Sequence, residues 1–464
     1  MMDSIKSRIH RRVNLDNIRL RRMVYRSNFP ELRFKNIIID GANPQQQAYM
    51  KKEFHKSDNK EFTYEDLKQG YFRLLSDKMI SEIIPHAIYN PEDDTYDLHL
   101  KVKLENNFAV RLGGNISTSN SNQIYLGLSY QDLNYYAKEF ILDGQLGKVY
   151  NNVQFMAKID FATAIPTSYR LIGSISTFDY FKKDKLFSRN NKPAFNQKDE
   201  RFLKLQVGLP FLSSKRAEFG VGIARIEDKY FQKSVIDFGN DKFDKSRYDL
   251  FGGSISFNGS TLNSKQYPTR GYREALVAQI FVGKERFYPG EGSTTSNNKD
   301  HHSWLQLSYM KEKYHNMSEH WVLGWYLKAL YASKNFSENY TATMMQAGEF
   351  SPTLHSKLTY NEAFLANQFV GAGIRPIYRL SQMFHLRGEF YGFMPIYPIE
   401  KNSLNKAYYG KAFSKFEYLG EISVVCQLPF GDISAYVNHY SSPKREWNVG
   451  LSIGWQLFNY RFIE

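Results

Sequence analysis

Cysteine is almost absent from this 464-residue chain, and several familiar motifs are missing altogether. The one cysteine, Cys426, cannot form an internal disulfide, and there is no CxxC pair to bind a metal. The sequence contains no H-E-x-x-H, Walker A, zinc-finger or RNP-type motif, so nothing indicates a metalloprotease, a P-loop protein or a nucleic-acid partner. No run of about 18 apolar residues occurs either, which excludes transmembrane helices.

Aromatic residues, in contrast, make up 16% of the chain, with 33 Tyr and 35 Phe, although the mean hydropathy is only −0.52. Apolar and polar residues alternate repeatedly along most of the sequence. Many aromatics, low mean hydropathy and this alternation together are typical of a transmembrane β-barrel, which presents apolar groups to lipid and polar groups to its lumen. A soluble propeller would carry fewer aromatics and would show repeats at a fixed spacing, which are absent.

The formal net charge of +14 predicts an anionic neighbour. For a barrel we expect outer-membrane lipids, including phosphorylated lipopolysaccharide, rather than nucleic acid. Residues 1–30 form a basic linker or helix that has neither the apolar core nor the cleavage site of a signal peptide. Its cations could bind anionic lipid or simply lie in solvent. They are Lys6, Arg8, Arg11, Arg12, Arg19, Arg21, Arg22 and Arg26.

Residues 31–105 predict a small domain with the order β-α-α-β-β. Residues 32–40 (LRFKNIIID) form the first strand, and Asn43-Pro44 has the sequence of a helix start. Thr63 and Asp66 resemble a capping box at the start of a second helix. Two strands follow, and the last, residues 95–104, alternates apolar and polar residues.

Residues 106–464 predict a sixteen-stranded antiparallel transmembrane β-barrel, so the chain as a whole is mainly β. About sixteen alternating segments of 9–15 residues are long enough to cross a membrane at a tilt. An even strand count returns the last strand to the side of the first, and long loops alternate with short turns, as in outer-membrane barrels. The segments begin near residues 107, 122, 137, 152, 168, 199, 216, 248, 271, 301, 319, 367, 382, 412, 431 and 445.

Gly450 to Gly454 match the G-x-S-x-G pattern of serine hydrolases, with Ser452 in the place of the nucleophile. The ten residues after Gly454 contain no His or Asp and leave no room for a helix. Apolar and polar residues alternate through the pattern, which favours a strand. Asp40, followed by Gly41, is better explained by a tight turn than by catalysis. We therefore expect no enzymatic activity, no catalytic residues and no cofactor or metal site.

Charged residues in the twelfth and thirteenth segments share the parity expected for the lumen. They could guide a substrate, hold a long loop, or form an ordinary ion-paired interior. These residues are Arg375, Arg379, His385, Arg387 and Glu389.

Three weaker signals are better explained by strands and loops. His301 and His302 are adjacent, so a strand would point them to opposite faces. Gly220 and Gly222 lack the third glycine of a dinucleotide-binding loop. The basic loop at residues 182–192 could contact surface phosphates or remain solvated.

A β-α-α-β-β domain directly before a sixteen-stranded barrel resembles the BamA/TamA-type outer-membrane assembly proteins, or bacterial surface antigens, which carry POTRA domains in the periplasm. Residues 267–272 (YPTRGY) resemble the family's P-T-x-G turn, and the longest loop, residues 333–364, lies where the family has its inward-folding sixth loop. That loop lacks the family's Arg-Gly-Phe/Tyr tip. The C-terminal strand, with Gly454, Trp455 and Phe458, resembles an assembly signal, which implies the barrel-assembly machinery as a partner.

A narrower resemblance joins residues 17–27, 31–54 and 366–380 to patatin-like phospholipases fused to such a barrel. It implies that a lipase domain precedes residue 1, and that the barrel anchors or exports it. Two other functions remain open: an assembly or translocation factor of the BamA/TamA type, and a passive barrel, with or without homo-oligomers. A weakly paired seam between the first and last strands would favour the assembly factor.

Overall fold

The computed structural model describes residues 15–27, 32–54, 61–92, 94–119, 122–163, 165–180, 196–211, 215–231, 242–290, 293, 298–442, 446–458 and 460–464. The chain divides into two units, one formed by Met1–Glu105 with Ala162–Ala164 and the other by the remaining residues. Half of the basic residues near the N-terminus and the basic loop at 182–192 lie outside the described residues. Arg19, Arg21, Arg22 and Arg26 lie on helix α2 (Leu15–Ser27).

The first unit contains the predicted β-α-α-β-β arrangement as a mixed sheet with two helices, and it resembles a POTRA domain. The sheet order is β2-β1-β4-β3, with β1 and β4 parallel and the other neighbours antiparallel. The two-residue strand β2 was not predicted, because it is too short to show a period. The elements are β1 (Arg33–Asp40), α3 (Pro44–Phe54), β2 (Phe62–Thr63), α4 (Tyr64–Leu75), β3 (Ile80–Asn90) and β4 (Thr95–Leu104).

Both predicted helix starts are capped as their sequences indicate. The Asn43 side chain accepts a hydrogen bond from the Gln46 N–H at 2.9 Å, and Gln46 Oε1 accepts one from the Asn43 N–H at 2.9 Å. Thr63 and Asp66 make the same reciprocal pair at the start of α4. Each pair satisfies N–H groups that have no partner within the helix.

Gly41 forms the turn after β1, and we expect Gly41→Ala to destabilise the first unit. Gly41 has φ +91, and a Cβ there would lie 2.1 Å from the carbonyl oxygen of Val102. The strained backbone alone costs about 1–3 kcal/mol. Unfolding in urea can be followed by the loss of protease resistance of residues 32–105. The urea concentration at the midpoint should be lower in the variant than in the parent protein. An unchanged midpoint would contradict the close packing of this turn against β4 (Thr95–Leu104).

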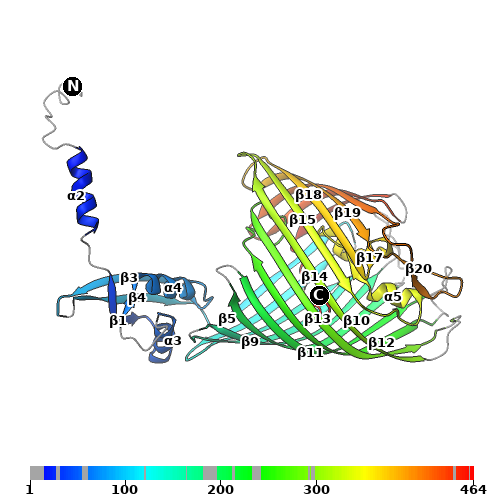
Figure 1. The fold of residues 1–464 in the computed structure, drawn as a ribbon, viewed down its shortest axis with the longest axis horizontal. Helices are drawn as coiled ribbons and strands as arrows, with labels where there is room; N and C mark the ends of the chain where they lie inside the picture. Colours follow the sequence, from blue (N-terminus) through cyan, green and yellow to red (C-terminus); the bar gives the residue numbers. More distant parts are fainter. Residues whose placement is uncertain are drawn as a thin grey trace, which may run out of the picture. The chain divides into compact units, whose positions relative to one another are not determined.

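The second unit is the predicted antiparallel barrel, and it closes with sixteen strands (Figure 1). Every predicted segment corresponds to one strand, but some strands are longer than expected, up to 19 residues in β14. These strands continue beyond the stretch in which apolar and polar residues alternate, into polar sequence that is typical of a loop. The strands are β5 (Phe108–Ser117), β6 (Gln123–Leu133), β7 (Ala137–Gly147), β8 (Tyr150–Phe161), β9 (Thr167–Tyr180), β10 (Asn196–Phe211), β11 (Lys215–Tyr230), β12 (Asp244–Ser260), β13 (Gly271–Tyr288), β14 (Asn298–Asn316), β15 (Trp321–Ala332), β18 (Gln368–Arg379), β19 (Phe384–Pro395), β22 (Glu417–Leu428), β23 (Gly431–Tyr440) and β24 (Glu446–Gly454).

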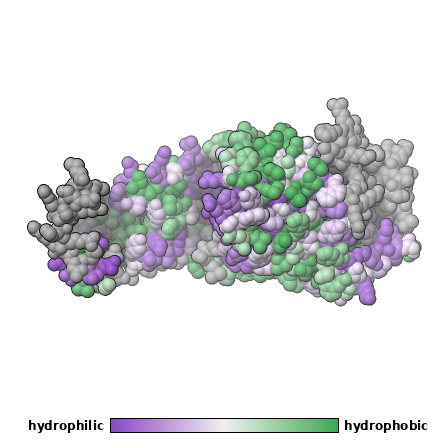
Figure 2. All heavy atoms as spheres, turned by 90° about the horizontal axis from the view of Figure 1, so that it is seen from above, coloured by the Kyte–Doolittle hydropathy of each residue, from purple (hydrophilic) through white to green (hydrophobic). Residues whose placement is uncertain are grey.

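Side chains on these strands alternate between an exposed apolar outer face and a buried inner face. In β15, Trp321 and Leu323 are 52% and 40% exposed, whereas Val322 is 1% exposed. Figure 2 shows apolar residues gathered over the side of the barrel turned to the viewer. Cys426 follows the outward parity and is half-buried. In the part of the chain that the structure describes, no helix is long and apolar enough to span a membrane.

Candidate functional site

The longest loop, between β15 and β18, folds back into the barrel. It joins the eleventh and twelfth strands, as the sequence predicts. Phe350 anchors it against the wall: its side chain is 2% exposed and stacks on Phe393 at 5.5 Å. The space exists because the wall residue opposite is Gly371, where a Cβ would lie 2.1 Å from the Phe350 ring. The loop contains α5 (Tyr340–Gln346), β16 (Gly348–Glu349), η1 (His355–Leu358), η2 (Glu362–Phe364) and β17 (Leu365–Ala366).

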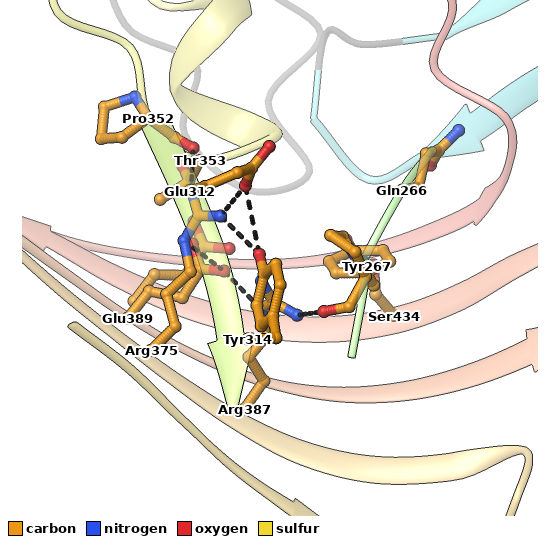
Figure 3. Close-up of polar contacts among 12 residues, drawn as sticks. Gln266, Tyr267, Glu312, Tyr314, Pro352, Thr353, Arg375, Arg387, Glu389 and Ser434 are labelled. Carbon is orange, nitrogen blue, oxygen red and sulfur yellow. Dashed lines mark hydrogen bonds and ion pairs between the residues drawn. The ribbon is translucent and has the colours of Figure 1, made fainter. Parts of the chain in front are cut away.

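A buried ionic cluster on the inner wall binds this loop through Arg375 on β18 (Figure 3). The Arg375 guanidinium pairs with Glu312 of β14 and donates to the hydroxyl of Tyr391 at 2.6 Å. It also donates to the carbonyl oxygen of Pro352, within the loop, at 3.1 Å. The arginine of this contact belongs to strand β18 of the barrel wall and not to the loop. The loop, which has no Arg-Gly-Phe/Tyr tip, is held through its backbone.

Arg387 on β19 extends the same cluster to a second segment. It pairs with Glu389, donates to the Tyr314 hydroxyl at 2.9 Å, and donates to the carbonyl oxygen of Pro268 at 2.8 Å. Pro268 belongs to the turn between β12 and β13, residues 261–270. This is the P-T-x-G-like turn, and it folds into the lumen instead of forming a tight hairpin.

The loop and the turn enter the lumen from opposite ends and meet there. Tyr267 is buried with φ +46, and its hydroxyl donates to Ser434 of β23 at 2.9 Å. The same hydroxyl lies 3.5 Å from Nε2 of His355, in the loop. The His355 Nδ1 atom lies 2.9 Å from a carboxylate oxygen of Glu421, and the ring stacks on Tyr436. The β12–β13 turn and the long loop are thus parts of one packed interior.

The alternation of side chains along each strand correctly predicted most of the residues that face the lumen. Arg375, His385, Arg387 and Glu389 are all at most 5% exposed. Arg379 does not join the cluster: it donates to the carbonyl oxygens of Ser318 and Glu319, at the β14–β15 turn. Its position at the end of β18 places it beyond the ionic core. The partners of the two buried arginines were not predicted from the sequence: they are Glu312, Tyr314 and Tyr391.

This cluster combines two arginines with two glutamates, so its formal charges cancel. A buried charge is tolerated only when it is paired and hydrogen-bonded. Each arginine meets that condition and uses a remaining donor for a backbone carbonyl of an inserted segment. The arrangement can hold the long loop and the turn in the lumen. Holding a long loop is one of the three roles that the sequence allows for these side chains.

A cavity of about 1090 Å³ remains beside the inserted loop. Lys357 of the loop lines this cavity, and a second loop lysine, Lys334, is 6% exposed. Burial, with a contribution from Arg273, lowers the pKa of Lys357 to about 8. Burial also lowers the pKa of Lys334 to about 7, and the nearby Lys198 adds to the effect. Lys334 Nζ lies 3.2 Å from Oε1 of Gln346, in α5, and 4.5 Å from the centre of the Trp304 ring.

We expect the barrel to melt at a higher temperature at pH 9 than at pH 6. The folded Lys334 loses its proton near pH 7, whereas an unfolded lysine keeps it to about pH 10.4. Between these values the unfolded chain binds more protons, so stability rises with pH. Lys334→Met should reduce the difference, as followed by thermal unfolding in detergent. An equal pH dependence in the two proteins would contradict this assignment.

The seam that closes the barrel is much shorter than its other ladders. Only three ladder pairs join β24 to β5: Ser452 with Ser117, Ile453 with Ile116, and Gly454 with Asn115. Directly after β5, the N–H of Thr118 also donates to the carbonyl oxygen of Leu451 at 3.0 Å. In the described residues, every other neighbouring pair of barrel strands has at least eight. The sequence could not indicate this difference, because it arises from the stagger of the two end strands.

The stagger leaves one edge of β5 open. From Phe108 to Gly114, β5 forms a ladder with β6 alone among the described strands. Phe108, Val110 and Leu112 are 57%, 54% and 80% exposed.

Beyond Gly454 the chain turns inward, so Trp455 and Phe458 do not extend the last strand as the assembly-signal resemblance implies. The side chain of Phe458 instead lies 5.9 Å from Tyr150, ring centre to ring centre.

The other sequence candidates occupy ordinary positions. Ser452 is a strand residue whose hydroxyl donates to Asn115 Oδ1 across the seam at 2.7 Å. Asp40 is exposed at the end of β1, in the other unit. His301 is exposed, whereas His302 is buried with Nε2 2.8 Å from a carboxylate oxygen of Glu285, so the pair does point to opposite faces. No group of three potential metal ligands occurs in the described residues.

Comparison with solved structures relates this fold to two kinds of barrel. BamA from Haemophilus ducreyi lacking POTRA domains 1–3 superposes with a TM-score of 0.60 at 12% identity, over 91% of this chain and 84% of that one. CdiB from Acinetobacter baumannii gives 0.53 at 9% identity, over 91% and 74%. CdiB from Escherichia coli gives 0.52 at 10% identity, over 91% and 76%. No family model and no curated protein matches the sequence. The chain thus has the fold of the BamA and CdiB barrels, with a small POTRA-like domain before it.

Proposed function

We propose that this chain is a bacterial outer-membrane barrel that assembles or translocates other polypeptides, with residues 31–105 in the periplasm. The observation that carries the proposal is the three-pair seam between β5 and β24. A passive barrel needs a continuous ladder, because unpaired backbone groups are costly in lipid. A seam that can open, beside an exposed strand edge, suits a protein that handles other chains.

The open edge of β5 offers a defined way to bind a client. An extended segment can add to a free strand edge through main-chain hydrogen bonds. Phe108, Val110 and Leu112 would then contact the outward side chains of the added strand. The fold shared with BamA and CdiB supports this function over a passive barrel. Anionic lipids around the outer face and the cell's own barrel-assembly machinery are the further partners we propose.

A photocrosslinker at the open edge tests the proposal. We expect benzoylphenylalanine at Leu112 to capture an unfolded outer-membrane β-protein during its insertion into liposomes that contain this chain. The matched control is Leu203, which is also exposed, at 47%, but is paired on both sides within β10. Equal capture at the two positions, or none at Leu112, would contradict client binding at the seam.

Anchoring or export of a patatin-like lipase remains a prediction from sequence resemblance, because no family model or curated protein matches. We also propose that this chain itself has no esterase activity. Ser452 is engaged with Asn115, and Asp40 belongs to a different unit. Hydrolysis of a lipid ester that Ser452→Ala abolishes would contradict this. An upstream reading frame encoding a fused lipase would support the anchoring role.

A further inference from the structure

The chain leaves the wall at Gly454, and the described residues beyond it, 455–458 and 460–464, run along the inner surface of the barrel. We call this segment the C-terminal strap. In the view of Figure 1, the C-terminus falls within the outline of the barrel. Gly454 has φ +115, and a Cβ there would lie 2.2 Å from the carbonyl oxygen of Gly114. The N–H of Trp455 donates to that same oxygen at 2.6 Å. This geometry requires glycine, and it directs the chain away from the open edge of β5.

The wall binds the strap mainly through the strap's backbone. Gln279 on β13 contacts it twice, accepting from the N–H of Glu464 at 3.0 Å and donating to the carbonyl oxygen of Phe462 at 3.2 Å. Buried side chains from four other strands make similar contacts. The N–H groups of Leu457, Tyr460 and Phe462 donate to Gln123, Gln154 and Glu200, and Gln306 donates to the carbonyl oxygen of Glu464.

One side chain of the strap has a socket of its own. Phe462 is 2% exposed, and its ring lies 5.9 Å from that of Phe202 and 5.7 Å from that of Phe281. Two wall glycines leave room for it: a Cβ at Gly222 or Gly252 would lie 3.0 or 3.1 Å from the Phe462 ring. By contrast, the side chain of Tyr460 is 44% exposed. Recognition thus combines backbone atoms at several positions with the buried Phe462 ring, and Phe458 and Arg461 add contacts with the rings of Tyr150 and Phe178.

The strap could be exchanged for another segment without breaking the barrel. It belongs to no strand ladder in the described part of the barrel, and it borders the cavity of about 1090 Å³. Backbone contacts of this kind accept many sequences. The strap also begins at the seam, so a client strand that adds to β5 would lie next to it.

We propose that the inner wall of β6, β8, β10, β13 and β14 is a binding site for an extended peptide with an aromatic side chain. The strap occupies this site at rest, and a client segment of the same chemistry displaces it. The contacts above support a peptide-binding site by themselves. That the natural peptide is a client segment rests on the proposed function.

Peptide binding in detergent tests the site. The probe is a dye-labelled peptide with the strap sequence WQLFNYRFIE, and the receptor is a variant that ends at Gly454. We expect saturable binding, which weakens about ten- to hundredfold when the peptide carries Phe462→Ala, because the buried ring is lost. A peptide with Tyr460→Ala is the matched control and should bind within about twofold of the parent. Equal binding of the Phe462→Ala peptide and the parent would overturn the socket.

A second experiment uses the full-length protein as the receptor, because the shortened variant could fail to fold. The intact protein should bind the probe more weakly than its own Phe462→Ala variant, because the strap competes only when its ring fills the socket. Probe binding that is the same in both would overturn occupancy by the strap. Since neither assay contains a client, a failure at the Leu112 crosslink would count against the proposed function and leave the peptide site standing.

Discussion

A disulfide across the seam should abolish client insertion reversibly. Ile116 on β5 and Ile453 on β24 are opposite each other, and both side chains are outward and exposed. Replacing both with Cys, in a Cys426→Ala background, would join the two end strands. We expect insertion of an unfolded outer-membrane β-protein into liposomes to fall to the rate without the protein, and to recover on reduction. The physical reason is that three ladder pairs can separate, whereas a covalent bond cannot.

The control for this experiment uses the one native cysteine. Cys426 on β22 faces Ile433 on β23 in a ladder of ten pairs. Ile433→Cys therefore allows a disulfide on the same outer surface, within a fully paired part of the sheet. Insertion should be unaffected there. Inhibition by both disulfides, or by neither, would contradict a role for opening between β5 and β24.

Arg375→Ala should release the long loop from the lumen. The substitution leaves Glu312 buried without its cationic partner and removes the donor to the carbonyl oxygen of Pro352. Breaking a buried ion pair from one side costs about 3–5 kcal/mol. We expect a protease to cut within residues 333–364 in the variant and to leave the wild-type loop intact, as followed by mass spectrometry of the fragments.

Arg379→Ala provides the matched control on the same strand. Arg379 is half-buried, and its guanidinium donates to carbonyl oxygens at the β14–β15 turn, outside the cluster. We expect it to cost about 0–1 kcal/mol and to leave the loop protected. A second variant, Arg375→Met with Glu312→Gln, removes both charges and should recover part of the lost stability. Protection of the loop in Arg375→Ala would show that the cluster does not hold it.

Much of the fold follows from the sequence because alternation is a local signal. The barrel segments, the two capped helices and the lumen parity of Arg375 and Arg387 all depend on residues within one element. Local period also shows that Ser452 lies in a strand. The strand ends were less predictable, since β14 continues through polar residues that alone resemble a loop.

The rest depends on how distant segments meet once the sheet closes. Arg375 lies next to Glu312, 63 residues away in sequence, because of the registers that join β14 to β15 and β15 to β18. The inward path of the Pro268 turn, the three-pair seam and the strap at Phe462 all follow from the same closure. None of these has a sequence period. The P-T-x-G resemblance did mark the turn as special, but it could not show that the turn fills the lumen.

We propose that the strands of the second unit cross a membrane with alternate side chains facing hydrocarbon. Spin labels along β10, in a Cys426→Ala background in nanodiscs, test it most directly. Leu203 and Leu205 are each 47% exposed, whereas Lys204 and Gln206 are each 5% exposed. We predict high collision rates with dissolved oxygen at 203 and 205 and low rates at 204 and 206. Oxygen accessibility without this period of two, or equal access of a water-soluble relaxant to all four positions, would contradict the account.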